Sequence, residues 1–302
     1  MIITDITKIG DPQIVLYDGK YYCYATNCEH YCEGFDVRVS EDLVTWSEPI
    51  HCFHAIASWG KSHFWAPEVV YHGGKFIMHY SAMSRELNSL RIGVAVSDSP
   101  AGPFRDVFDA PMFDMGYAAI DGSVLISDEG NFLYYSRDCS ENVVDGIRVS
   151  QLYCVELDES LTKCIGEHTL VSTPTEEFER KSLNRGGTPT LWNEGPTVIF
   201  DGNYYIMNYS ANCYATNDYA ICISYAKSPR GPFIKPASNP VLSCRDDLFG
   251  SGHNAFFKTK SGELMTAFHI QTDPMRPSGD RRVVIGKVDI SYKDGVPNQV
   301  IS

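Results

Sequence analysis

Three acidic residues occupy the same local setting at distant points of the chain. Asp11, Asp121 and Glu194 each stand directly before a proline or a glycine, at the start of an apolar segment. Proline and glycine favour tight entries to strands, so each carboxylate is held at the head of a strand. Two carboxylic acids that face each other across a pocket can hydrolyse a glycosidic bond: one protonates the leaving oxygen and the other activates water. A third acid nearby raises the pKa of the donor by like-charge repulsion.

The apolar segments that carry these acids belong to a repeated unit. Each unit is a short apolar strand, a turn centred on glycine, and a second strand rich in Tyr, Phe and Met. The five copies span residues 10–26, 66–82, 121–137, 191–211 and 253–269. Glycine supplies the positive φ that hairpin turns require. The five turn glycines, residues 19, 74, 130, 202 and 262, lie 55, 56, 72 and 60 residues apart.

The spacing of these hairpins predicts the fold. A further segment with the alternating pattern of a β-strand follows each hairpin, and the motif SPxGPF recurs at 99–104 and 228–233. A period of about 55 residues with room for four short strands is typical of a propeller blade. We therefore predict an all-β, five-bladed β-propeller that forms a single domain over residues 1–302. The third spacing between turn glycines, 72 residues, is the longest, and it predicts an insertion at 163–190 that covers one face of the propeller.

In a propeller, the first strand of each blade lines the central channel, and all five start at the same end. Counting back eight or nine residues from each turn glycine gives one position per blade: Asp11, Trp65 or Ala66, Asp121, Glu194 and His253. Taken singly, an acid at a strand start is explained by bonds to nearby backbone N–H groups. Three acids at one register favour a site at the mouth of the channel.

Composition narrows the classes of partner. The 302 residues carry a net charge of −13, which argues against nucleic acid and anionic membranes and favours a neutral or cationic small molecule. No stretch approaches the ~20 apolar residues of a membrane span, and the N-terminal segment lacks the pattern of a secretory signal. The ten cysteines form neither a disulfide pattern nor a paired zinc motif, so we expect reduced thiols in a cytoplasmic protein.

At these positions the chain resembles glycoside hydrolase family 43, the inverting pentosidases built on a five-bladed propeller. The resemblance runs in order along the chain through GDPQIV (10–15), FWAPEVV (64–70), IDGS (120–123), NEGP (193–196) and GSGHNAFF (250–257). It implies that Asp11 is the general base, that Asp121 tunes pKa values and orients groups, and that Glu194 is the general acid.

The resemblance also suggests roles for residues around the acids. Phe64 and Trp65 offer a flat apolar face for a sugar ring, although core packing is expected for one of the two. Arg282 is a candidate donor to sugar hydroxyls, with Arg281 as its competitor. His253 lies on the channel axis, where family members often hold a calcium ion or a water. Calcium prefers oxygen ligands, so a weak site or a hydrogen-bonded core histidine is equally expected there. The acid–base chemistry itself requires no cofactor.

The resemblance implies removal of terminal pentose from short xylo- or arabino-oligosaccharides. We favour a β-D-xylosidase, followed by an α-L-arabinofuranosidase and then an endo-arabinanase, and an insertion that closes the pocket would favour exo action. Two alternatives belong to other classes: a non-catalytic carbohydrate-binding propeller and a retaining, fructan-active propeller. The sequence leaves the oligomeric state open.

Overall fold

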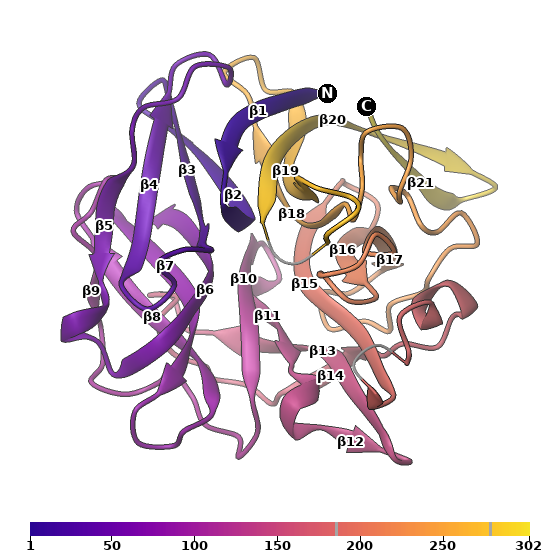
Figure 1. Ribbon diagram of the computed structural model, residues 1–302, viewed down its shortest axis with the longest axis horizontal. Helices are drawn as coiled ribbons and strands as arrows, with labels where there is room; N and C mark the ends of the chain where they lie inside the picture. The colour runs from indigo at the N-terminus through magenta and orange to yellow at the C-terminus, as the bar shows by residue number, and fades with distance from the viewer. Residues whose placement is uncertain (185–186, 278–279) are drawn as a thin grey trace.

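The computed structural model describes residues 1–184, 187–277 and 280–302. Its strands form antiparallel blades arranged around a central axis, which confirms the five-bladed β-propeller (Figure 1). Blade I consists of β2 (Ile9–Tyr17), β3 (Lys20–Asn27), β4 (Gly34–Ser40) and β5 (Ile50–His54). Blade II consists of β6 (Gly60–His72), β7 (Lys75–Ser84), β8 (Leu90–Ser97) and β9 (Arg105–Asp106).

The remaining blades follow the same order from the channel outward. Blade III consists of β10 (Ala119–Ser127), β11 (Gly130–Arg137), β13 (Ile147–Leu157) and β14 (Thr169–Ser172), with the short β12 (Val143–Val144) beside β13. Blade IV consists of β15 (Thr190–Phe200), β16 (Tyr205–Ala211) and β17 (Ala220–Ala226), and a short parallel pairing of β13 with β15 joins it to blade III. Blade V consists of β18 (Gly252–Lys258), β19 (Leu264–Gln271), β20 (Arg281–Lys293) and the N-terminal β1 (Ile2–Thr7), while β21 (Val296–Ile301) also pairs with β20.

The N-terminal strand closes the ring. β1 pairs antiparallel with β20, so that Ile2 lies opposite Ile285, and the first strand of the chain completes the last blade. The Thr4 hydroxyl adds a bond of 2.9 Å to the backbone carbonyl of Val283. The sequence repeats did not predict this closure, because β1 lies before the first hairpin.

All five inner strands carry the same irregularity at their heads. The register of each innermost pair shifts near the head of the strand, and in every blade one such shift contains a residue with positive φ: Asp11, Ala66, Asp121, Gly195 and His253. Bulges of this kind bend a strand and re-aim its side chains. The repeated bulge therefore turns the residues at this register toward the channel mouth.

Side chains on the second strands hold these bulges in place. The backbone N–H of Ala66 donates to Thr26 Oγ1 at 2.8 Å, that of Asp121 to Ser81 Oγ at 2.9 Å, and that of His253 to Ser210 Oγ at 2.7 Å. In each case the hydroxyl belongs to the preceding blade. The Asp11 N–H closes the ring by donating to His269 Nδ1 of blade V at 3.1 Å. These bonds fix one blade head against the next.

The recurring SPxGPF segments also join neighbouring blades. The buried Tyr24 of blade I donates its hydroxyl to the carbonyl of Pro100 at 2.5 Å. In the same way, the buried Tyr134 of blade III donates to the carbonyl of Pro229 at 2.6 Å. The two segments are thus equivalent corners, as their shared sequence indicated.

The region predicted as an insertion at 163–190 is only partly one. Its residues Thr169–Ser172 form β14, the outer strand of blade III, and a single 3₁₀ turn, η3 (Glu177–Arg180), follows. Two other 3₁₀ turns, η1 (Ala55–Ala57) and η2 (Cys139–Glu141), lie elsewhere. Residues 185–186 of the predicted insertion lie outside the described residues. No helix in the described part of the chain is long and apolar enough to cross a membrane.

A buried ion pair anchors η3 to blade IV. Glu179 is fully buried, and its carboxylate accepts bonds from Lys235 Nζ at 2.6 Å, Asn193 Nδ2 at 3.0 Å and the Tyr209 hydroxyl at 2.9 Å. Asn193 directly precedes Glu194, so this network also supports the strand head that carries the predicted acid. Breaking a buried pair on one side leaves an uncompensated charge in the interior.

We expect Lys235→Met to lower the free energy of unfolding by about 3–5 kcal/mol. Urea denaturation of the purified protein measures this quantity. Lys287→Met is the matched control, because its 3.5 Å pair with Asp289 is exposed and its loss costs about 1 kcal/mol or less. Equal midpoints for the two variants would show that the Glu179 pair contributes nothing particular to stability.

Candidate active site

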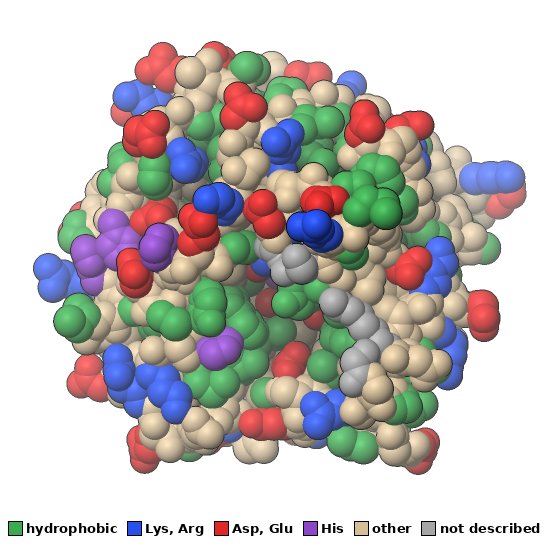
Figure 2. Space-filling view, in the orientation of Figure 1, with side chains coloured by type: hydrophobic (Ala, Val, Ile, Leu, Met, Phe, Trp, Pro, Cys, Tyr) green, Lys and Arg blue, Asp and Glu red, His purple; other side chains and the backbone are tan. Residues whose placement is uncertain are grey.

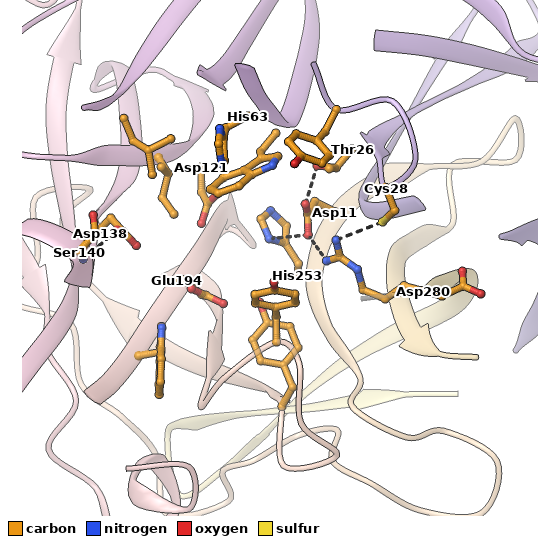
Figure 3. Close-up of a pocket in the computed structure, with 18 of the residues that line it drawn as sticks. Asp11, Thr26, Cys28, His63, Asp121, Asp138, Ser140, Glu194, His253 and Asp280 are labelled. Atoms are coloured by element: carbon orange, nitrogen blue, oxygen red, sulfur yellow. Dashed lines mark hydrogen bonds and ion pairs between the residues drawn. The ribbon is translucent and has the colours of Figure 1, made fainter. Parts of the chain in front are cut away.

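A cavity of about 800 Å³ opens at the end of the channel where the inner strands begin. Figure 2 shows this hollow near the centre of one face, with acidic side chains inside it. Its walls include Asp11, Asp121, Glu194, His253 and Trp65, so five of the predicted site residues meet there. Asp121 and Glu194 lie on one side, Asp11 lies on the other, and His253 stands between them (Figure 3). The bulged strand heads bring these residues together from all five blades.

Asp11 is the most strongly paired carboxylate in the cavity. Its Oδ1 lies 2.9 Å from Arg281 Nη1 and 3.3 Å from His253 Nδ1, and its Oδ2 accepts the Thr26 hydroxyl at 2.6 Å. Burial by itself raises the pKa of Asp11, but Arg281 and then His253 outweigh burial and hold the pKa well below its usual range. Asp11 is therefore ionised and able to accept a proton from water.

Glu194 and Asp121 lie in the opposite electrostatic setting. Burial, and next the charge of Asp121, raises the pKa of Glu194 well above its ordinary value, while a hydrogen bond from Tyr219 acts in the other direction. Burial also raises the pKa of Asp121, to about 6, although His253 opposes the rise. Asp121 Oδ2 accepts the Gly195 N–H at 3.1 Å and the Ser136 hydroxyl at 3.2 Å. Burial and the nearby charge of Asp121 therefore favour the protonated form of Glu194, the form that can donate a proton.

Arg281, rather than Arg282, lines the cavity. Successive side chains of a strand point to opposite faces, so only one of two neighbouring arginines on β20 can face the channel. Arg281 is buried, and its guanidinium also lies 5.1 Å from the centre of the Tyr214 ring. A Cβ at Gly10 would come within 2.0 Å of this guanidinium, so position 10 has to be glycine for Arg281 to reach Asp11. The expectation placed on Arg282 is corrected accordingly.

Replacing Arg281 should move the acidic limb of the pH profile. Arg281 lowers the pKa of Asp11, so Arg281→Met raises that pKa, and the base loses its proton only at higher pH. We expect the acidic limb of kcat/KM to shift upward by about one pH unit or more. Arg282→Met is the control and should leave the limb in place. A limb that stays fixed in Arg281→Met would show that Asp11 does not set it.

Phe64 and Trp65 have different environments. Phe64 is fully buried, with its ring stacked on Tyr80 at 6.0 Å, so the prediction that Phe64 contacts a sugar is wrong. Trp65 lines the cavity, and its ring meets His63 edge-on at 4.9 Å. Alternation along β6 explains the difference, because neighbouring side chains on a strand face opposite ways. Trp65 remains available as an apolar face for a ring.

His253 is a residue of the cavity wall. Among the residues that the structure describes, no group of three or more His, Cys, Asp or Glu side chains is arranged to hold a metal ion. The residues around His253 thus do not supply the oxygen-rich cage that calcium prefers. Calcium beside His253 stays a prediction, and the chemistry below involves only protein side chains. His269, which accepts the Asp11 N–H, is fully buried.

Several wall residues escaped the sequence analysis. Most of them lie outside the strands, namely Tyr31, Asp138, Ser140, Tyr214 and Tyr219, whereas His63 and Trp192 lie on β6 and β15. Loop residues have no fixed register relative to the turn glycines, so the repeat could not locate them. Thr26, by contrast, could have been found, because a Thr or Ser closely follows a tyrosine six to eight residues after the turn glycine in four hairpins, at Thr26, Ser81, Ser136 and Ser210.

Comparisons with known proteins agree with this geometry. The model of the family "Glycosyl hydrolases family 43" matches residues 6–297. A curated relative, the extracellular endo-α-(1→5)-L-arabinanase 1 of Bacillus subtilis strain 168, is 25% identical over 82% of this chain and 73% of its own length.

Solved structures resemble the chain over nearly its whole length. A thermostable family-43 glycoside hydrolase is 39% identical, with a TM-score of 0.89 over 98% of this chain and 94% of the other. An endo-1,4-β-xylanase from Bacteroides thetaiotaomicron VPI-5482 is 30% identical, with a TM-score of 0.83 over 98% and 94% of the two chains. The chain is thus a glycoside hydrolase, and it belongs to glycosyl hydrolase family 43.

Proposed function

We propose that the protein hydrolyses pentose-containing oligosaccharides by a single displacement, with Asp11 as general base and Glu194 as general acid. The observation that carries this proposal is the opposite electrostatic bias of two carboxyl groups in one cavity. Arg281 and His253 favour the ionised form of Asp11, whereas burial and Asp121 favour the protonated form of Glu194. An inverting glycosidase needs this division between its two acids.

The reaction follows from these protonation states. Asp11 accepts a proton from a water molecule as the water oxygen attacks the anomeric carbon. Glu194 gives its proton to the glycosidic oxygen as the bond to the leaving sugar breaks. Asp121, held by Ser136 and the Gly195 N–H, disfavours the ionised form of Glu194 by its nearby charge. The products are a free pentose of inverted configuration and a shortened oligosaccharide.

The favoured substrate is a short β-linked xylo-oligosaccharide, with α-L-arabinofuranosides as further substrates. The name of the similar B. thetaiotaomicron structure, an endo-1,4-β-xylanase, supports β-xylosyl bonds. The strongly acidic chain and the carboxylates in the cavity favour a neutral sugar over an anionic one.

Endo-arabinanase activity is the second candidate. The name of the B. subtilis relative supports it. The structure also removes one argument for exo action, since no described residue of 163–190 lines the cavity.

The test uses three substrates and one spectroscopic readout. Rates on p-nitrophenyl β-D-xylopyranoside, p-nitrophenyl α-L-arabinofuranoside and linear arabinan rank the candidate activities. Proton NMR of the first product formed from xylobiose reports its anomer, and the proposal expects the inverted one. A retained anomer would overturn the roles of Asp11 and Glu194, and binding of xylobiose without any product would favour a carbohydrate-binding propeller.

A further inference from the structure

Among the described residues, the cavity wall carries three carboxylates that the proposed reaction does not use, Glu29, Asp138 and Asp280, and Asp138 is the one whose charge acts on Glu194. Asp138 directly follows β11 and caps η2, where its Oδ1 accepts the Ser140 N–H at 2.9 Å. Its own N–H donates to the carbonyl of Ala118 at 2.8 Å, so the backbone on both sides is fixed. Asp138 and Ser140 both line the same cavity as the three acids. The side chain is thus held in one orientation by a cap and by the sheet.

The second oxygen of Asp138 remains available to a ligand. Within the described residues, Oδ2 receives only the weak thiol donor of Cys139, at 3.8 Å. The residue is half-buried and lies at the cavity wall. Carboxylate oxygens are strong acceptors for hydroxyl groups, and such a bond is stronger than one between neutral groups. An oxygen in this position is suited to receive a sugar hydroxyl.

Its position places Asp138 on the leaving-group side. Figure 3 shows Asp138 beyond Asp121 and Glu194, on the side of the cavity away from Asp11. In the proposed reaction, water is activated at Asp11 and the departing sugar is protonated at Glu194. The departing sugar therefore lies on the Glu194 side. Trp192 precedes Glu194 by two residues on β15 and also lines the cavity, and an indole ring is a large flat surface for packing.

The placement of Asp138 has an electrostatic cost. Its charge raises the pKa of Asp121 and of Glu194, which already repel each other. A neutral residue would avoid this repulsion and still cap η2, since Asn and Ser are also good N-caps. The carboxylate thus does more than its structural role requires.

We infer that Asp138 determines specificity by accepting a hydroxyl of the leaving-group sugar, with Trp192 as the flat face of that subsite. This inference rests on the proposed function. It gives the enzyme a preference for substrates whose leaving group is itself a sugar over those with an aryl leaving group. It also makes Asp138 one of the groups that face Glu194, together with Asp121, Tyr219 and Asp11.

Two variants separate the effect of the Asp138 charge from the effect of its side-chain length. Asp138→Asn keeps the cap and an acceptor oxygen but removes the charge, and Asp138→Ser keeps the cap but shortens the side chain. The control is Asp145→Asn, an exposed charge in the Asp145-Gly146 turn of the same blade, where Asn-Gly preserves the turn. Each variant is assayed for kcat/KM on xylobiose and on p-nitrophenyl β-D-xylopyranoside.

We expect Asp138→Ser to lower kcat/KM on xylobiose by about tenfold or more, because one hydrogen bond to a charged acceptor is lost. Its kcat/KM on the aryl xyloside should stay within about twofold of the wild-type value. Asp138→Asn should lower kcat/KM on xylobiose by less than Asp138→Ser does. In both variants the basic limb of kcat/KM should move to lower pH, because the charge of Asp138 raises the pKa of Glu194. Asp145→Asn should match the wild type in all of these measurements.

The outcomes distinguish this inference from the proposed function. If the wild type cleaves neither xyloside, the same variants are compared on arabinobiose and the aryl arabinofuranoside, and inactivity on these four substrates and on linear arabinan refutes the proposed function itself. If the wild type is active but Asp138→Ser loses both substrates of a pair equally, or neither, Asp138 does not contact the leaving sugar. An unchanged basic limb in both variants would likewise contradict its position beside Glu194.

Discussion

Glu194→Gln is expected to lower kcat on xylobiose by about 10²–10⁴-fold, because the leaving sugar then departs without a proton. Glutamine has nearly the same shape and retains hydrogen bonding, so binding and folding should change little. An aryl xyloside with a strongly acidic phenol as leaving group needs less protonation and should lose much less activity. The ratio of the two losses is the signature of a general acid.

Steady-state kinetics on both substrates measure this ratio. Glu263→Gln is the matched control, since Glu263 is exposed in a turn of blade V far from the strand heads. The assignment of the acid fails if Glu194→Gln keeps near wild-type turnover on xylobiose. It also fails if both substrates lose activity in the same proportion.

Asp11→Asn is expected to cause a loss of similar size, but on every substrate alike. The base acts on the water and not on the leaving group. A better leaving group therefore cannot compensate for a missing base. Asparagine also cannot form the ion pair that Asp11 makes with Arg281. This ion pair holds Arg281 in place in the cavity wall. Rates on a series of aryl xylosides of differing phenol acidity provide the comparison.

Asp18→Asn controls for this substitution within the same hairpin. Asp18 stands before Gly19 at the exposed turn, where Asn-Gly is an equally good turn sequence. It should leave kcat unchanged. A loss in Asp11→Asn that shrinks as the phenol becomes more acidic would assign Asp11 to the acid role instead.

The fold and the acid triad could be predicted because they depend on a repeat. The hairpin period identified the propeller, and a count back from the turn glycines placed Asp11, Asp121 and Glu194 at one register. The structure shows why the count works: every inner strand carries a bulge at this register. The bulge itself was not predicted, since residues with positive φ other than glycine have no strong sequence signal.

What the sequence missed depends on side-chain direction and on loops. The choice between Arg281 and Arg282, and between Phe64 and Trp65, depends on which face of a strand each residue occupies. An error of one position in the count places a side chain on the opposite face of the strand. The repeat located the strand heads only to within one residue. Asp138 lies in a loop after its strand, so only the folded chain brings it beside Glu194.

The central claim is that Asp11 and Glu194 act on one sugar from opposite sides of the channel mouth. A crystal structure of Glu194→Gln with bound xylobiose tests it most directly. We predict that the side chain at position 194 contacts the glycosidic oxygen, and that Asp11 holds a water beneath the anomeric carbon. A disaccharide whose scissile bond lies out of reach of either residue would contradict the account.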